Sequence, residues 1–436
     1  MAALLLAGLV AWQLVPMPQS LPTAEAPSAA ARPGPAPRLS IVVLPFANLG
    51  SDAEQQTFAD GITDDLTTDL SRIGGMFVIS RKTAFNYKGR AVSARQIGQE
   101  LGVRYVLEGS VRRSGNQLRI NVQLIDAETG AHLWAERFDS NTGDLFVIQN
   151  DITGRLSNAL NLELVSAEAA RPTDHDDALK YILRGRAALD KGAAPDNLSQ
   201  AIDQFEHALT VDPRSVEAQS SLAITLLTRV LTRMTTSPSG DVGRAKVLIA
   251  RSLTISPHNT LAHFAKGLVL RAEDRCDEAI PEFETVIASD RNSTDALFFL
   301  GLCKLLTGSI DETIPLEEQA IRLSPRDPYA YSRYLVIGEV HLLQSRTEEA
   351  IIWLEKARTA NPASHHVHGK LASAYALKGD LARAAVELAA ARRLTSGKDY
   401  SSILYLKAGF WGVPAVRALY EATFFAGLRK AGVPDD

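Results

Sequence analysis

"DALFFLGLCKLLTGSIDETIPLEEQAIRLSPRD" (residues 295–327) is typical of two amphipathic helices joined by a short turn. Thr313 and Ala320, seven residues apart, are small enough to let two helices approach closely where they cross. Pro325 follows the second helix, and proline cannot continue a helix. The stretch therefore predicts a pair of closely packed helices.

The same pattern recurs along the chain from about residue 176. Small side chains, proline closures and regular spacing define it. The first set of small positions is Ala201, Ala245, Ala279, Thr313, Ala350 and Ala384; seven residues on lie Ala208, Ser252, Val286, Ala320, Ala357 and Ala391; twelve on lie Pro213, Pro257, Arg291, Pro325, Pro362 and Ser396. The steps are 44, 34, 34, 37 and 34 residues.

This period resembles the tetratricopeptide repeat, a stack of helix pairs. The resemblance predicts about six repeats over residues 176–396, with capping helices over 397–436 that cover the open end of the stack. Arg291 and Ser396 in place of proline, and Thr313 in place of alanine, depart from the pattern without breaking its period.

Stacked helix pairs curve into a superhelix whose concave face is lined by the first helix of each pair. We expect an extended peptide or a surface element of a partner protein to bind there. The alternative for each apolar member is a place in the core between repeats. The candidate groove residues are Phe264, Leu268, Arg271, Phe298, Leu302, Leu305, Leu335, Glu339 and Leu342.

Residues 40–165 predict an α+β domain that precedes this array. Apolar runs at 40–46 and 76–80 are typical of strands, and helical spacing dominates 53–73, 93–102 and 145–161. "LEGSVRRSGNQLRINVQLID" (107–126) alternates apolar and polar residues on both sides of a glycine-containing turn. No helix follows its glycines, as a phosphate-binding loop would require, so it predicts a hairpin. The expected order is β-α-β-α-β-β-β-α around one mixed sheet.

The motifs "LPF", "FADGITDDL", "ELGVRYVLEGSV" and "QLIDAETG", with "HLWAERFD" after them, resemble the TolB amino-terminal-like domain of bacterial envelope proteins. This domain followed by tetratricopeptide repeats also resembles the C-terminal half of bacterial class III adenylate or guanylate cyclases and of membrane-anchored winged-helix regulators. The resemblance implies an extracytoplasmic sensing half whose effector domain lies upstream.

The first residues, "MAALLLAGLVAWQLV" (1–15), are almost wholly apolar and predict a short helix. They are fewer than the roughly 20 residues that span a membrane, so we expect a membrane anchor or the end of a longer transmembrane helix. Residues 16–39, rich in proline and alanine, predict an extended linker. We therefore expect an inner-membrane protein with periplasmic domains, with a cytoplasmic location as the alternative.

Composition argues against several function classes. The net charge of -4 gives no basic surface for nucleic acid. Two cysteines, Cys276 and Cys303, are too few for a disulfide framework or a structural zinc site, and they predict buried thiols. The acidic helix face (Asp60, Asp64, Asp65 and Asp69) and the histidines at 365, 366 and 368 are weak metal candidates without further ligands.

No phosphate-binding loop, dinucleotide fingerprint, zinc-protease motif or serine-hydrolase elbow occurs in the sequence. We therefore expect a non-catalytic protein, without cofactor or metal, that mediates protein–protein interaction in a signal-transduction system of the bacterial envelope. The alternatives are a fragment or subunit of a cyclase whose catalytic domain lies outside this chain, and a cytosolic repeat scaffold.

Overall fold

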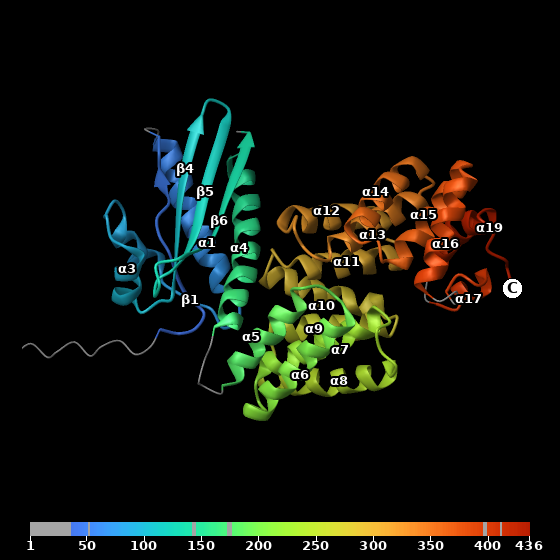
Figure 1. Ribbon diagram of the computed structural model, residues 1–436, viewed down its shortest axis with the longest axis horizontal. Helices are drawn as coiled ribbons and strands as arrows, with labels where there is room; N and C mark the ends of the chain where they lie inside the picture. The colour runs from blue at the N-terminus through green and yellow to red at the C-terminus, as the bar shows by residue number, and fades with distance from the viewer. Residues whose placement is uncertain (1–35, 51–52, 142–144, 172–176, 396–398, 410–411) are drawn as a thin grey trace, which may run out of the picture.

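The computed structural model describes residues 36–50, 53–141, 145–171, 177–395, 399–409 and 412–436. A domain built on a mixed sheet is followed by an all-helical superhelix, as predicted (Figure 1). The expected anchor at 1–15 and nearly all of the linker at 16–39 lie outside the described residues. Within the described ranges, no helix combines the length and the apolar character needed to cross a membrane.

The sheet of the first domain has six strands, five of them in the order β3-β1-β4-β5-β6, and β2 pairs with β4. The strands are β1 (Ser40–Val43), β2 (Ala47–Asn48), β3 (Phe77–Val78), β4 (Tyr105–Ser114), β5 (Gln117–Asp126) and β6 (His132–Asn141). Pairs among the first four are parallel, and β4, β5 and β6 form an antiparallel meander. The sheet is therefore mixed, as predicted.

Helices cover the sheet unequally. On one face, α1 (Ala53–Ser71) and α4 (Leu145–Ala170) bury the main core, in which Ile62, Leu66 and Leu156 are fully buried. On the other face, α2 (Arg81–Ala84), a short turn η1 (Phe85–Tyr87) and α3 (Ala94–Leu101) cover β1 and the start of β4. The rest of that face carries the polar side chains of the meander.

The stretch 107–126 is a hairpin. Ser114 pairs with Gln117 across a two-residue turn, and Gly115 has a φ of 59°. Glycine at the first turn position is what a type II′ hairpin turn requires. Gly109 serves a different purpose: a Cβ there would come within 2.2 Å of the Phe46 ring, so only glycine lets that ring lie across the strand.

Over residues 178–394, a stretch that the structure describes without a gap, the chain forms six helix pairs. They are α5 (Ala178–Leu189) with α6 (Pro195–Val211), α7 (Val216–Leu231) with α8 (Pro238–Ile255), α9 (Thr260–Ala272) with α10 (Cys276–Ser289), α11 (Thr294–Thr307) with α12 (Thr313–Leu323), α13 (Ala330–Leu343) with α14 (Thr347–Ala360), and α15 (His365–Lys378) with α16 (Leu381–Leu394). A 3₁₀ turn, η2 (Ile310–Glu312), precedes α12. All the small residues of the first two sets, Ala201 to Ala391, are buried at the crossings.

The two parts share a packed junction. Leu183 of α5 is fully buried in the core of the sheet domain. Asn292, before α11, donates a hydrogen bond of 2.8 Å to Asp69 of α1, and Asn158 of α4 donates one of 3.2 Å to the Asn292 carbonyl. Because these groups are buried or half-buried, the junction fixes the two parts against each other.

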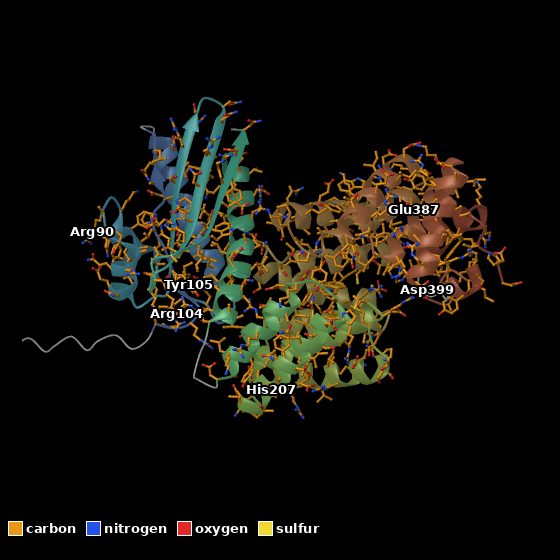
Figure 2. All side chains as sticks on the ribbon, in the orientation of Figure 1. Arg90, Arg104, Tyr105, His207, Glu387 and Asp399 are labelled. Carbon is orange, nitrogen blue, oxygen red and sulfur yellow. The ribbon has the colours of Figure 1, made fainter. Side chains whose placement is uncertain are left out.

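Glu168, near the end of α4, is a buried carboxylate at the base of the sheet. It accepts a hydrogen bond of 2.6 Å from Tyr105, and Arg104 and Arg171 lie 3.2 and 3.5 Å away. Figure 2 shows Arg104 and Tyr105 at the lower end of β4. Burial, followed by the hydrogen bond to Glu168 and then its negative charge, raises the pKa of Tyr105.

The end of the chain differs from the simple cap that the pattern predicts. After α17 (Ile403–Lys407), the helical run α18 (Pro414–Tyr420), η3 (Glu421–Phe425, one π-helical turn) and α19 (Ala426–Lys430) lies against first helices of the fourth, fifth and sixth pairs. The Val413 amide donates to the Leu306 carbonyl of α11, and Ser373 of α15 donates to the Phe424 carbonyl. We call residues 413–430 the C-terminal helix. It lies along the stack.

Candidate peptide-binding groove

Four of the predicted groove residues are partly exposed on the first helices of the pairs. Arg271 lies on α9, Phe298 and Leu302 on α11, and Leu335 on α13. The Phe298 ring contacts Phe299 edge to face at 4.9 Å, and the Arg333 guanidinium lies over it at 5.3 Å. These partly exposed residues, from three successive pairs, form the accessible part of the candidate groove.

Phe264 and Leu268 lie instead in the core between repeats. Their exposed fractions are 8% and 1%. Phe264 packs against Phe283 and Phe299, each 5.9 Å away between ring centroids. These two side chains stabilise the stack, and a ligand cannot reach them without moving the aromatic cluster.

Leu305, Glu339 and Leu342 are also buried, for a different reason. Leu305 and Leu342 belong to one apolar cluster with Tyr420, Phe424 and Leu428 of the C-terminal helix. These two positions, one in the fourth pair and one in the fifth, thus belong to the same core as the C-terminal helix. At these positions the inner face of the repeats therefore packs against a segment of the same molecule.

Glu339 holds the C-terminal helix through a buried polar contact. Its carboxylate accepts a hydrogen bond of 2.5 Å from the Tyr420 hydroxyl and pairs with the Lys370 ammonium. The Lys370 ammonium also lies 4.9 Å from the centre of the Phe424 ring, within cation–π range. Burial and the neighbouring Glu339 carboxylate raise the pKa of Tyr420 well above its ordinary value, so the phenol remains protonated as a donor.

Tyr420, Phe424 and Leu428 recur every four residues, and all three are at most 2% exposed. They form one face of a helix, because residues four apart lie one above the other. The surface formed by α11, α13 and α15 therefore accommodates a helix with an aromatic and aliphatic face and one polar group opposite Glu339. Sequence reasoning missed Lys370 and these C-terminal residues, although their four-residue spacing in "YEATFFAGL" (420–428) was a usable signal.

Acidic side chains gather where the first pair approaches the fifth. The Tyr329 hydroxyl, before α13, donates a hydrogen bond of 3.3 Å to the Leu189 carbonyl of α5. Nearby, Arg333 contacts Asp295 at 2.9 Å and Asp327 at 3.0 Å. Burial raises the pKa of Asp190 to about 6; Arg186 opposes the rise, and Asp295 and Asp327 add to it.

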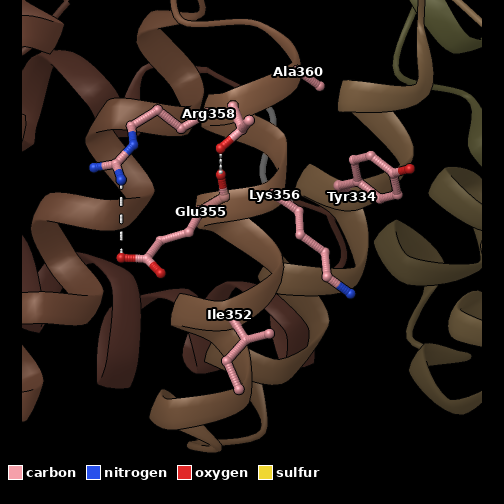
Figure 3. Close-up of a pocket in the computed structure, with 7 residues that line it drawn as sticks. Tyr334, Ile352, Glu355, Lys356, Arg358 and Ala360 are labelled. Atoms are coloured by element: carbon pink, nitrogen blue, oxygen red, sulfur yellow. Dashed lines mark hydrogen bonds and ion pairs between the residues drawn. The ribbon is translucent and has the colours of Figure 1, made fainter.

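An open hollow of about 550 Å³ lies beside α14, lined by Tyr334, Ile352, Glu355, Lys356, Arg358, Thr359 and Ala360 (Figure 3). The Thr359 hydroxyl donates to the Glu355 carbonyl, and the Arg358 guanidinium lies 3.9 Å from the Glu355 carboxylate. Thr359, Glu355 and Arg358 are thus engaged with one another rather than with a ligand.

The structure pairs most of the weak metal candidates with other side chains. Asp60 pairs with Lys88, Asp64 with Arg81, and Asp65 accepts from Gln149, while Asp69 lies at the domain junction. His368 bonds Glu387 and the Pro362 carbonyl, just as His263 bonds Glu282 and the Pro257 carbonyl. Because the same pairing recurs in two repeats, we assign His263 and His368 a structural role. Within the described part of the chain, no group of three or more metal-ligating side chains comes together.

Comparison with known protein families supports this division of the chain. Residues 264–328 match a tetratricopeptide repeat model, so the third and fourth helix pairs are tetratricopeptide repeats. Residues 37–155 match the model described as "HilA/YgeH-like transcriptional regulator, second domain". That match is to a different description from the TolB amino-terminal-like domain, and the TolB resemblance stays a prediction.

A protein of Rhizobium meliloti (strain 1021) named "Putative adenylate cyclase 3" is 39% identical to this chain over 261 residues. The alignment covers 58% of this chain and 44% of the relative, so the chain spans less than half of that protein.

Among solved structures, pilF of Pseudomonas aeruginosa is similar at 19% identity and a TM-score of 0.38, covering 53% of this chain and 96% of that one. A tetratricopeptide protein of Thermus thermophilus is similar at 19% identity and a TM-score of 0.36, covering 45% and 98%. At these TM-scores neither likeness bears on function.

Proposed function

We propose that this chain is a non-catalytic protein-interaction scaffold that binds helical or extended segments of a partner on the inner face of its repeats. One observation supports it above the others: three of the pairs already hold an amphipathic helix on that face, with Tyr420, Phe424 and Leu428 buried against them. A surface that holds a helix in this way uses the helix-in-groove mode of peptide recognition.

The partner surface in this proposal is the partly exposed stretch formed by Arg271, Phe298, Leu302 and Leu335. Arg271 supplies a positive charge and Phe298 an aromatic ring, which together suit a segment with an apolar and an acidic residue. The test is capture of the partner from cells of the source bacterium by the whole chain and by the double variant Arg271→Glu, Phe298→Ala. A matched control is Val386→Ala on α16, because Val386 is 68% exposed.

We expect the unchanged chain and the Val386 variant to retain the same protein, and the double variant to lose it at least tenfold with its helicity unchanged. Equal recovery with all three would refute the groove assignment.

We further propose that the chain is the sensing or scaffolding portion of a larger signalling protein, and that an effector such as a nucleotide cyclase domain lies in the remainder. The relative named as an adenylate cyclase supports this, because more than half of its length lies outside the alignment. Membrane anchoring through residues 1–15, with the folded domains in the periplasm, belongs to the same proposal. A cytosolic scaffold is the alternative.

An immunoblot of native cells against the repeats tests this second proposal. A band well above 47.1 kDa that sediments with membranes supports it. A band at 47.1 kDa or slightly below would remove the upstream effector. Release of the protein from membranes by mild salt would contradict the anchor and leave the groove proposal intact.

A further inference from the structure

The chain has two cysteines, and the fold brings them together. Cys276 is the first residue of α10 in the third pair, and Cys303 lies in α11 of the fourth pair. Their Sγ atoms are 2.6 Å apart, and the two residues are 2% and 0% exposed. Two residues 27 apart in sequence therefore face each other across the boundary between consecutive pairs.

The surroundings of the two thiols are apolar. They share a core cluster with Ala279, Leu300 and Leu306. The described residues near them offer no group of three metal-ligating side chains, so the pair is not part of a metal site assembled by these residues. The chemistry left to two adjoining thiols is either inert packing or a bond between the sulfurs.

The position of Cys276 favours its thiolate. A helix N-terminus stabilises negative charge, and Cys276 occupies one. The hydrogen bond from Cys303 lowers the pKa of Cys276. Burial acts in the opposite direction, and the positive charge of Arg271 lowers the pKa further. The thiolate is the species that attacks a disulfide.

We propose that Cys276 and Cys303 form an intramolecular disulfide that joins the third and fourth repeats when the chain meets an external disulfide as oxidant. The Cys276 thiolate attacks one sulfur of the external disulfide, which forms a mixed disulfide and expels one thiolate. The Cys303 thiolate then attacks the Cys276 sulfur and expels the second thiolate. The external disulfide is reduced to two thiols, which take up the two protons, and the protein loses two hydrogens.

The bond would join helices of separate repeats. It would link α10 to α11, which is also the point where the repeats covered by the C-terminal helix begin. Relative movement of these repeats would then be restricted on the scaffold's inner face. Because both sulfurs are buried, we expect oxidation mainly during folding or during local opening.

The test uses the whole chain, unfolded and then refolded in oxidised or in reduced glutathione. Each sample is quenched in acid, denatured and alkylated, and its intact mass is measured. We expect the oxidised sample to take up no alkyl groups, to be lighter by two hydrogens, to stay monomeric and to unfold at a higher denaturant concentration. Added reductant should restore the two alkylated thiols, the original mass and the lower denaturant concentration of unfolding, and the chain should stay monomeric.

The single variants Cys276→Ser and Cys303→Ser serve as matched controls. In reduced glutathione each should take up one alkyl group. In oxidised glutathione each can form only a mixed disulfide with glutathione and no internal bond, so neither should show the oxidant-dependent rise in unfolding midpoint expected of the wild type. Two alkyl groups on the oxidised, refolded wild-type chain would overturn the proposal, and so would a disulfide found only between chains. The mass measurement does not depend on partner binding, so its outcome is independent of the scaffold proposal.

Discussion

The Tyr420 hydroxyl donates a hydrogen bond of 2.5 Å to Glu339, which fastens the last helix of the chain to the fifth repeat. Tyr420→Phe removes one donor from a buried carboxylate and leaves Lys370 as its partner. We expect a loss of stability of about 1–2 kcal/mol, within the usual range for hydrogen bonds to charged groups. Chemical denaturation followed by circular dichroism measures it.

Tyr405→Phe is the control for that change, because Tyr405 is 51% exposed. It should leave the unfolding midpoint within experimental scatter. If the Tyr420 variant were as stable as the wild type, the hydrogen bond to Glu339 would not hold the C-terminal helix.

Glu317 occupies a position that the other repeats give to an apolar residue, among them Phe205, Phe283 and Leu354. Its side chain is fully buried, and neither carboxyl oxygen has a hydrogen-bond partner among the residues described. Gly301 makes room for it, since a Cβ there would come within 2.6 Å of its Oε1 atom. Burial raises the pKa of Glu317 well above 4.5, and the charge of Arg333 only partly opposes this.

Because the folded-state pKa is raised, the folded chain binds a proton that the unfolded chain releases near pH 4.5. Glu317 therefore destabilises the fold increasingly as the pH rises from about 4.5 to the folded pKa, and fully above it. We expect Glu317→Leu to stabilise the chain at pH 8 by about 1–3 kcal/mol and to have less effect at pH 5.

Thermal unfolding at several pH values checks this prediction. Glu318→Leu is the matched control, because Glu318 is the exposed neighbour of Glu317. A Glu317 variant that is destabilised at pH 8, or whose effect does not vary with pH, would contradict the raised pKa of the buried carboxyl group.

Glu168→Gln should destabilise the sheet domain. The substitution removes the charge that Arg104 and Arg171 contact and weakens the acceptor of the Tyr105 hydroxyl. We expect the free energy of unfolding to fall by about 2–3 kcal/mol. This is less than for a fully buried ion pair, because the arginines are partly exposed. Glu163→Gln on the same helix is the control, and a larger loss there would refute the role given to Glu168.

Asn292→Ala should loosen the junction between the two parts of the chain. It removes the 2.8 Å hydrogen bond to Asp69. The Asp69 carboxylate still has its ion pair with Arg72, at 3.2 Å. We expect about 1–2 kcal/mol of local stability to be lost. Hydrogen exchange should quicken in α4 around Asn158, and Asn197→Ala, which breaks a bond within the first repeat, should leave that region unchanged.

The helix pairs were predictable because their spacing follows from local geometry. Small residues such as Ala279 and Ala350 recur where helices cross, and their burial is the direct consequence. The hairpin at 107–126 was predictable for the same kind of reason, since alternation and a glycine turn are local signals.

The groove was only partly predictable. Spacing placed Leu305 and Leu342 on the inner face, but it could not indicate that the C-terminal helix lies there, because the pairing of distant segments has no local signal. Glu317 was hidden by an otherwise apolar pattern. The contact between Cys276 and Cys303 depends on how two consecutive pairs stack, which the period alone does not specify.

The C-terminal helix leaves the ribosome after everything it packs on. Until it arrives, the nascent fourth to sixth repeats present Leu305 and Leu342 without the apolar residues of the C-terminal helix, and a chaperone can recognise such an apolar surface. A stop codon before residue 414 would leave this surface permanently uncovered. Loss of the last two dozen residues should therefore cause aggregation and proteolytic removal of the whole protein, even though every repeat is intact.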